Sequence, residues 1–299
     1  ALRRRKVRQV RQGPCPDNSM GQGRGANMHP MTTAAARSFT ARLGLELPII
    51  QAPMAGFQGV AMTSAVAGAG ALGSLPGAAM TPPALRDAVA EMRRAGRLPV
   101  NLNFFCHVVP AADPQREAAW RAALRPYYDE LGMPESAIQN GPGRLPFGEE
   151  ATGVIEALRP EVVSFHFGLP PAPLLERVRA TGAQVWSSAT TVAEAQWLAA
   201  HGVDAVIAQG ADAGGHRAVF LDDWQGSDLS TQLRTLPLLA SLLEVVRVPV
   251  IAAGGISTAD GVAEALRLGA SAVQLGTAFL LCPEASTSAV HRAALQGEG

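Results

Sequence analysis

Hydrophobic and polar positions follow two patterns along the chain. Short apolar runs rich in β-branched residues alternate with longer stretches in which apolar residues recur every three or four positions. The short runs predict strands, and the longer stretches predict helices. The predicted strands are residues 48–52, 71–75, 99–103, 162–166, 184–187, 205–208, 248–252 and 272–275. The predicted helices are residues 59–68, 82–94, 172–181, 191–201, 230–246 and 258–268.

The order of these elements predicts the fold class. Strands that are each followed by a helix or a long excursion pair in parallel, and eight such units close a (β/α)8 barrel. We therefore predict an α/β TIM barrel over residues 39–299. An open doubly wound sheet is the alternative, but the segment after the first strand, Pro53-Met54-Ala55-Gly56, is not the GxGxxG fingerprint of that fold.

Residues 104–157 interrupt the regular alternation. This segment is rich in proline, contains both tyrosines of the chain, and has helical patterns at 115–131 and 149–158. It follows the third predicted strand, and barrel enzymes perform their chemistry at the C-terminal ends of the strands. We predict that it is an inserted helical segment that covers the active site.

The formal charge is balanced overall but uneven along the chain. The net charge is +0 and the pI is about 7.2, so no global feature points to nucleic acid. Residues 1–38 are basic, with Asp17 as their one acidic residue, and we interpret them as a disordered leader. Because ordered patterning begins only near Phe39, we expect the true start at Met31. A nucleic-acid arm or a targeting sequence is the alternative. Lys6 is the only lysine, which excludes lysine-nucleophile chemistry in the barrel.

Three further patterns concern a membrane span, disulfides and metal binding. Residues 47–85 carry no charge, but prolines and glycines interrupt them too often for a bilayer helix, so we expect buried strands and no membrane partner. The cysteines, Cys15, Cys106 and Cys282, are widely spaced, which fits a reducing cytoplasm without disulfides. No histidine–carboxylate pair has metal-ligand spacing, and we predict no metal site.

Glycine-rich segments at three strand ends carry the candidate chemistry. Gly214-Gly215, Gly254-Gly255 and Gly276-Thr277 each follow a predicted strand. Backbone free of side chains lets N–H groups approach a phosphate, and the loops after strands seven and eight of such barrels commonly bind one. Relief of crowding at strand ends is the alternative interpretation of these glycines.

His216 follows the first of these glycine pairs. Imidazole titrates near neutral pH, so His216 is the candidate acid–base residue above the phosphate-bearing cofactor, the alternative being an exposed loop histidine. His166 ends the fourth predicted strand and either lines the pocket or packs in the core. Cys106 and His107 follow the third strand and are weaker candidates.

At these residues the chain resembles the nitronate monooxygenases, once called 2-nitropropane dioxygenases, which are flavin-dependent (β/α)8 barrels. The resemblance covers about residues 43–285. Its landmarks are residues 48–56, 101–103, 163–168, 209–217, 253–255 and 274–277. Asp212 stands where glutamate is usual in the family, and Ala218 where glycine often follows the His-Arg pair.

The resemblance implies that FMN lies across the barrel mouth and that His216 is catalytic. Ser188, which the resemblance places among the cofactor contacts, stands where part of the family has a lysine. The absence of that lysine leaves phosphate neutralisation to backbone dipoles and Arg217. The implied flavin-ring and ribityl contacts are Pro53, Met54, Ala55, Asn103, Gln209 and Gly214. The implied phosphate contacts are Gly254, Gly255, Gly276 and Thr277, with Gln274 and Leu275 in the same segment.

The activity implied by the resemblance is oxidation of alkyl nitronates or nitroalkanes by O2 to carbonyl compounds and nitrite. A related alternative is a flavin-dependent enoyl-acyl-carrier-protein reductase that uses NAD(P)H. A catalytically silent FMN-binding barrel and a non-flavin isomerase of phosphorylated metabolites are the others. The expected partners are the small-molecule substrate and O2, without nucleic acid, and a homodimer is left open.

Overall fold

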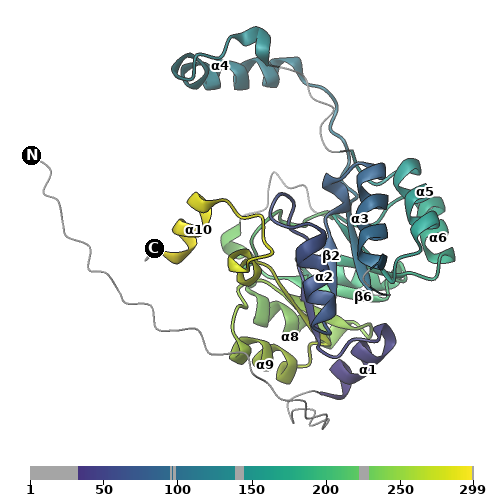
Figure 1. Ribbon diagram of the computed structural model, residues 1–299. Helices are drawn as coiled ribbons and strands as arrows, with labels where there is room; N and C mark the ends of the chain where they lie inside the picture. The colour runs from purple at the N-terminus through teal and green to yellow at the C-terminus, as the bar shows by residue number, and fades with distance from the viewer. Residues whose placement is uncertain (1–32, 95, 97–98, 139–144, 222–228, 298–299) are drawn as a thin grey trace, which may run out of the picture. The chain divides into compact units, whose positions relative to one another are not determined.

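Eight parallel strands form one sheet at the centre of the chain (Figure 1). The computed structural model describes residues 33–94, 96, 99–138, 145–221 and 229–297, so most of the predicted leader lies outside the described residues. The strands are β1 (Ile49–Gln51), β2 (Gly73–Leu75), β3 (Val100–Phe105), β4 (Val162–His166), β5 (Gln184–Ala189), β6 (Ala205–Gln209), β7 (Val250–Ala253) and β8 (Ala272–Leu275).

The sheet closes on itself. Each strand from β2 to β8 pairs with its sequence neighbour, and β1 pairs with β8 in the register Ile49 to Val273. A parallel bridge between Ile50 and Leu72, beside β2, completes the ring. The predicted (β/α)8 barrel is therefore confirmed, and the open doubly wound alternative is wrong.

Helices surround the sheet (Figure 1). All six helices predicted outside the insertion are present, with ends that differ by a few residues. Two helices near the ends of the described chain, α1 and α10, were not predicted. The helices are α1 (Ala34–Leu43), α2 (Val60–Gly68), α3 (Pro82–Arg94), α4 (Pro114–Glu130), α5 (Glu149–Leu158), α6 (Ala172–Ala180), α7 (Val192–Ala200), α8 (Thr235–Val245), α9 (Ala259–Leu268) and α10 (Ala289–Gln296).

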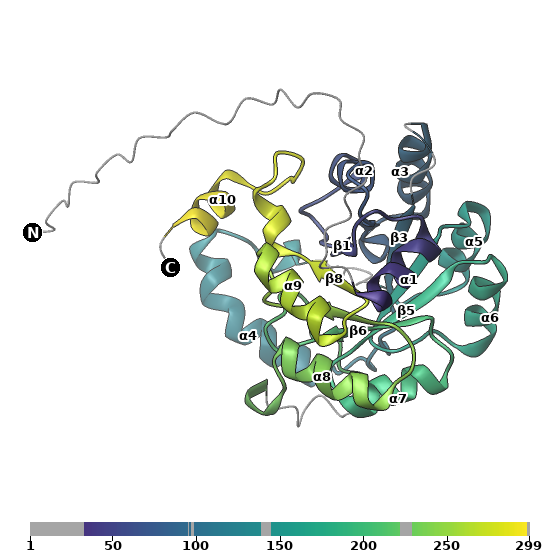
Figure 2. The ribbon, with the colours of Figure 1, turned by 90° about the horizontal axis from the view of Figure 1, so that it is seen from below.

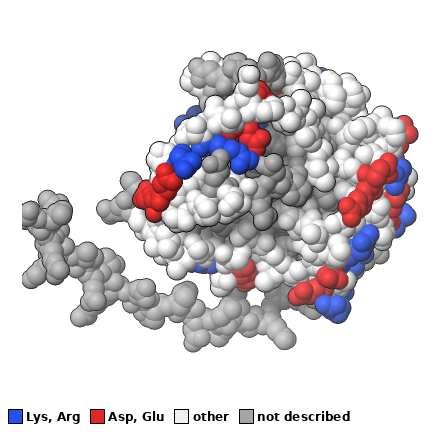
Figure 3. Space-filling view, turned by 90° about the horizontal axis from the view of Figure 1, so that it is seen from above, with Lys and Arg blue, Asp and Glu red and all other residues white. Residues whose placement is uncertain are grey.

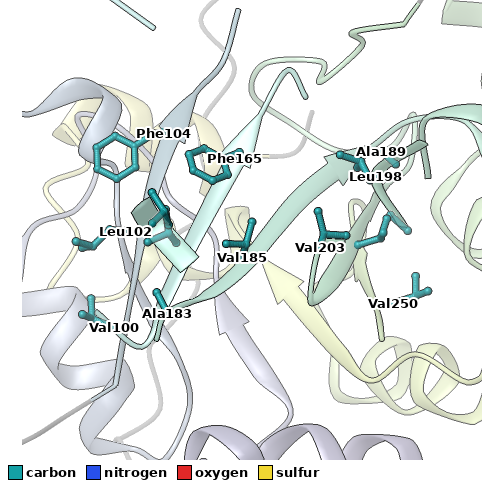
Figure 4. Close-up of a cluster of buried hydrophobic side chains, with 14 of the residues drawn as sticks. Val100, Leu102, Phe104, Phe165, Ala183, Val185, Ala189, Leu198, Val203 and Val250 are labelled. Carbon is teal, nitrogen blue, oxygen red and sulfur yellow. The ribbon is translucent and has the colours of Figure 1, made fainter. Parts of the chain in front are cut away.

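The strands are buried on both faces, as parallel strands under a layer of helices must be. One face contributes to a large core between sheet and helices, which includes Leu102, Phe165, Val185 and Leu198 (Figure 4). The opposite faces point into the barrel. This arrangement leaves the ends of the strands as the places where polar side chains and ligands can be accommodated.

The N-terminal end of the barrel is filled by apolar side chains. Phe39 of α1 packs against Trp186 of β5 with ring centroids 5.4 Å apart, in a cluster that also contains Ile50 and Ile251. α1 lies at this end of the strands in the view from below (Figure 2). Because this end is packed shut, the open end is the C-terminal one.

The predicted insertion contains two helices of different character. α5 buries Val154 and Ile155 and packs against α3 and α6, so it is the regular barrel helix between β3 and β4. No residue of α4 is buried by the described chain, and Trp120 is 65% exposed. The expected helices are thus confirmed, whereas covering of the active site stays a prediction.

No helix in the described ranges is both long and apolar enough to cross a membrane. Charged side chains on the face seen from above form groups of both signs (Figure 3). Arg177 forms ion pairs with Glu149 and Glu156.

Candidate active site

A cavity of about 540 Å³ opens at the C-terminal ends of the strands. This volume is within the range typical of small-molecule and cofactor sites. Segments that follow β1, β2, β6, β7 and β8 contribute to its wall, together with side chains near the ends of β3, β4 and β5. The predicted site residues that line it are Pro53, Met54, Ala55, Asn103, Ser188, Gln209, Gly214, His216, Gly254, Gly255, Gln274, Gly276 and Thr277.

Leu275 is the one predicted site residue outside that lining. Its side chain belongs to the core between sheet and helices, and its carbonyl accepts the backbone N–H of Ala52 at 2.8 Å. Side chains alternate between the faces of a strand, so Leu275 points away from the side on which Gln274 lies. The tertiary structure therefore brings the other residues of the implied cofactor and catalytic sets together at one cavity, apart from Arg217.

The glycines after β7 have a packing role. Gly254 and Gly255 have φ angles of +125° and +63°. A Cβ atom at Gly254 would lie 2.7 Å from the backbone nitrogen of Ala213, and one at Gly255 would lie 2.8 Å from the Cβ of Asp212. These two glycines thus let the end of β7 pack against the loop after β6, as the crowding alternative proposed.

Gly276, after β8, has no such requirement. Its φ is −112°, and a Cβ atom there would lie 3.7 Å from Ala52 Cβ and Met54 Sδ, an ordinary contact. Packing therefore does not explain the bare backbone at this point in the cavity wall. A ligand that approaches the backbone closely does explain it.

Asp212 anchors the loop that carries His216. Its carboxylate accepts the backbone N–H of Thr235 at 3.0 Å and the Nε–H of Arg234 at 2.6 Å, at the N-terminus of α8. Burial acts to raise the pKa of this carboxyl, but the hydrogen bonds from Thr235 and Arg234 outweigh it, so the pKa of Asp212 is lowered. The negative charge also suits a helix N-terminus.

Gln209, the last residue of β6, holds the backbone of His216. Its Nε2 donates to the His216 carbonyl at 2.8 Å, and its Oε1 accepts the N–H of Ala218 at 2.9 Å. The imidazole of His216 lies against the rings of Phe105 and Phe167, with centroids 5.1 and 6.1 Å away. The backbone is thereby pinned while the exposed ring borders the cavity.

His166 lines the cavity and is hydrogen-bonded on both ring nitrogens. Its Nδ1 lies 2.9 Å from the hydroxyl of Ser188, and its Nε2 lies 3.3 Å from the carbonyl of His216. Burial lowers the pKa of His166 to about 4, with further lowering by the nearby His216 and Arg217. His166 is therefore neutral near pH 7. The His216 carbonyl can only accept, so this contact assigns the proton to Nε2 and leaves Nδ1 as the acceptor.

Two residues expected near the phosphate, Ser188 and Arg217, form hydrogen bonds with other parts of the protein. The hydroxyl of Ser188 faces His166, as described above. Arg217 donates to the carbonyl of Gly210 at 2.7 Å and to Gln232, and burial lowers its pKa. Arg217 does not line the cavity, so the expectation that its charge neutralises a phosphate there is not supported.

Gln274 presents an unsatisfied polar atom at the cavity. Its Oε1 is buried and has no hydrogen-bond partner among the described residues. A buried amide oxygen without a partner costs about 1–3 kcal/mol. A hydrogen-bond donor on a bound ligand would remove this cost.

The sequence alone missed several aromatic residues of the site. Phe57 and Phe105 line the cavity. Phe167 has a φ of +65°, which is unfavourable for a residue with a Cβ atom, and its ring contacts Phe105, His166 and His216. The signal in the sequence was the clustering of Phe and His after strands three and four, which local patterns cannot distinguish from core packing.

The weaker candidates do not reach the cavity. Burial raises the pKa of the Cys106 thiol far above its ordinary value, which makes it a poor nucleophile. His107 contacts Phe105 and Phe167 at the edge of the aromatic group. In the described part of the chain, no cluster of three His, Cys, Asp or Glu residues could hold a metal ion.

Fold and site together define a class: a parallel barrel whose strand ends surround a cofactor-sized cavity with histidine and glycine-rich backbone in its wall. The family model described as nitronate monooxygenase matches residues 37–299, and the chain belongs to this family, which is flavin-dependent in general.

The comparisons with individual proteins agree with this assignment. The chain is 44% identical over 261 residues to the nitronate monooxygenase of Pseudomonas aeruginosa, covering 87% of this chain and 73% of that protein. It is 41% identical over 263 residues to the nitronate monooxygenase of Paraburkholderia phytofirmans, covering 88% of this chain and 71% of that one.

Solved structures show the same fold. The nitroalkane oxidase of Streptomyces ansochromogenes is similar with a TM-score of 0.77 and 34% identity, covering 87% of this chain and 73% of the other. FabK from Thermotoga maritima is similar with a TM-score of 0.62 and 26% identity, covering 86% of this chain and 66% of the other. The nitroalkane oxidase is thus the better match of the two.

Proposed function

We propose that this protein is an FMN-dependent nitronate monooxygenase. It oxidises alkyl nitronates or nitroalkanes with O2 and releases a carbonyl compound and nitrite. The observation that carries the proposal is the convergence of His216, Asn103, Gln209 and Gly276 on one cavity of cofactor size. Membership of the nitronate monooxygenase family supports the same conclusion.

The residues present fit a flavin mononucleotide. Backbone N–H groups at Gly255 and Gly276 and the hydroxyl of Thr277 would hold its phosphate. The unpartnered Oε1 of Gln274 would accept a hydrogen bond from the bound molecule. Pro53, Met54 and Ala55 would border its ring, beside Asn103. When bound, the flavin supplies the redox chemistry between the organic substrate and O2.

His216 would handle the proton of the substrate. As a neutral imidazole it would take the α-proton of a nitroalkane, and as an imidazolium it would donate a hydrogen bond to a nitronate oxygen. Hydrogen bonds to the His216 backbone limit movement of the imidazole ring, so the ring keeps a fixed position relative to a bound substrate. Phe57, Phe105 and Met54 give the cavity an apolar wall that limits water around the reacting carbon.

The test is nitrite release and O2 consumption by the FMN-reconstituted chain with an alkyl nitronate. The His216→Asn variant should bind FMN with unchanged affinity and lose most of its turnover. The matched control is His201→Asn, because His201 stacks on Trp197 at the C-terminal end of α7 and does not line the cavity. Unchanged nitrite release in the His216→Asn variant would exclude this assignment.

Each alternative function predicts a different result with the purified protein. Rapid NAD(P)H oxidation with an enoyl thioester, without nitrite release, would indicate an enoyl-acyl-carrier-protein reductase. Bound FMN without turnover of either substrate would indicate a catalytically silent barrel. A colourless protein that ignores added FMN would indicate a non-flavin isomerase.

We further propose that the enzyme acts in the cytoplasm, without a nucleic-acid or membrane partner. A homodimer remains compatible with the proposal. Light scattering of the FMN-loaded protein measures the oligomeric state directly.

A further inference from the structure

His166 lies within reach of the residue proposed to transfer the proton, but it contacts that residue's backbone and not its ring. Its Nε2 is 3.3 Å from the carbonyl oxygen of His216. The same carbonyl accepts the Nε2–H of Gln209 at 2.8 Å. Two side chains from two different strands, β4 and β6, thus converge on one backbone oxygen.

The carbonyl of His216 determines which nitrogen of His166 carries the proton, because a carbonyl oxygen can only accept and Nε2 must therefore donate. The hydroxyl of Ser188, on β5, lies 2.9 Å from Nδ1. The Ser188 side chain is fully buried, and its hydroxyl donates a hydrogen bond to the unprotonated Nδ1. That arrangement leaves the proton of the neutral ring on Nε2, where it points at the His216 carbonyl.

We propose that His166 is a positioning residue: its Nε2–H donates to the carbonyl of His216 and so fixes the His216 ring at the cavity, while the Ser188 hydroxyl, bonded to Nδ1, orients the His166 ring for this bond. This role rests on the proposed function of His216. It assigns Ser188 to the support of His166 and not to a phosphate. The strained backbone of Phe167, directly after His166, is consistent with a segment held in place by its contacts.

A pair of amide substitutions separates this role from simple packing. The amide nitrogen of glutamine reaches the position of Nε2, whereas that of asparagine reaches only the position of Nδ1. His166→Gln therefore keeps the donor to the His216 carbonyl, and His166→Asn loses it. Ser188→Ala keeps the donor on His166 but removes the partner that orients its ring.

The first readout is steady-state nitronate oxidation. Loss of one net hydrogen bond corresponds to a change of roughly 3- to 10-fold. We expect His166→Asn to lower kcat by about that factor or more, with KM and FMN affinity within about threefold of the wild type. His166→Gln should recover most of kcat, and Ser188→Ala should fall between the two.

The second readout does not depend on turnover. Hydrogen–deuterium exchange of residues 210–221, measured on the full chain with and without FMN, reports opening of the His216 loop, in which the Ala218 N–H is bonded to Gln209. Exchange should accelerate roughly 3- to 10-fold in His166→Asn and remain near the wild-type rate in His166→Gln. The urea midpoint of each variant separates loop opening from global unfolding.

Equal exchange rates and equal kcat in the Asn and Gln variants would overturn the proposal. If His166→Asn does not fold, His166→Leu is the second variant that lacks the donor. If the wild type releases no nitrite, the proposed function of the protein fails, while the exchange comparison still decides whether His166 holds the loop.

Discussion

The buried carboxylate of Glu194 accepts the backbone N–H of Phe220 at 2.8 Å. Glu194 is also the third residue of α7, where it completes a capping box with Thr191. One side chain therefore accepts backbone hydrogen bonds at the N-terminus of α7 and also holds the segment that follows His216. Stability of the helix layer and order of the candidate active site are connected through this residue.

Removal of the Glu194 carboxylate should destabilise the whole domain. The oxygens accept the N–H and hydroxyl of Thr190, the N–H of Thr191 and the N–H of Phe220. Glu194→Ala leaves these buried donors without a partner, and we expect a loss of about 3 kcal/mol in the free energy of unfolding by urea. The exposed Glu264→Gln change on α9 is the control and should have little effect. Equal stabilities of the two variants would contradict the assignment.

Gln209 should matter for turnover through its donor group. Gln209→Glu retains an acceptor for the Ala218 N–H but has no donor for the His216 carbonyl, so we expect kcat to fall about tenfold or more. Gln184→Met is the control because Gln184 lies at the opposite end of the barrel, bonded to Trp186. Nitrite release measured for both variants checks the difference, and a Gln209→Glu enzyme with normal kcat would refute it.

Alanine substitutions at the glycine-rich ends of β7 and β8 should have different effects. Gly255→Ala places a Cβ atom 2.8 Å from Asp212 Cβ at a φ of +63°, and we expect a loss of about 1–3 kcal/mol in stability. Gly276→Ala meets ordinary contacts at 3.7 Å, so stability should remain unchanged while FMN affinity falls. Urea unfolding and fluorescence titration with FMN measure the two effects. Wild-type FMN affinity in Gly276→Ala would place the phosphate elsewhere.

His166 should make the protein sensitive to acid. Burial lowers the pKa of His166 to about 4 from an ordinary value of 6.5, so between these values the unfolded chain binds a proton that the folded chain does not. Stability therefore falls as the pH decreases from 6.5 towards 4. Since part of the ring faces the cavity, we expect a contribution of no more than about 2 kcal/mol.

The His166→Gln variant provides the comparison for this effect, because glutamine does not titrate. Its free energy of unfolding in urea should depend less on pH between 4 and 6.5 than that of the wild type. Parallel pH curves for the two proteins would show that His166 is not buried as a neutral ring.

Much of the fold followed from local patterns. Buried parallel strands need continuous apolar runs, and their helices need a three-to-four-residue apolar repeat, so both leave a periodic signal in the sequence. Thr191 and Glu194 even marked the start of α7 correctly. α1 was missed because its stability depends on Phe39 packing against Trp186, a contact between residues that are far apart in the chain.

For the candidate site, the sequence by itself determined which strand ends carry glycine, histidine and amide side chains, because these residues interrupt the apolar pattern. Only the tertiary structure decided what each of them does. It directed Arg217 to a strand-end carbonyl, showed that Gly254 and Gly255 relieve crowding, and placed Ser188, His166 and the His216 carbonyl in one hydrogen-bonded series. Hydrogen bonds depend on distances and directions between strands, and residues on separate strands acquire these only when the barrel closes.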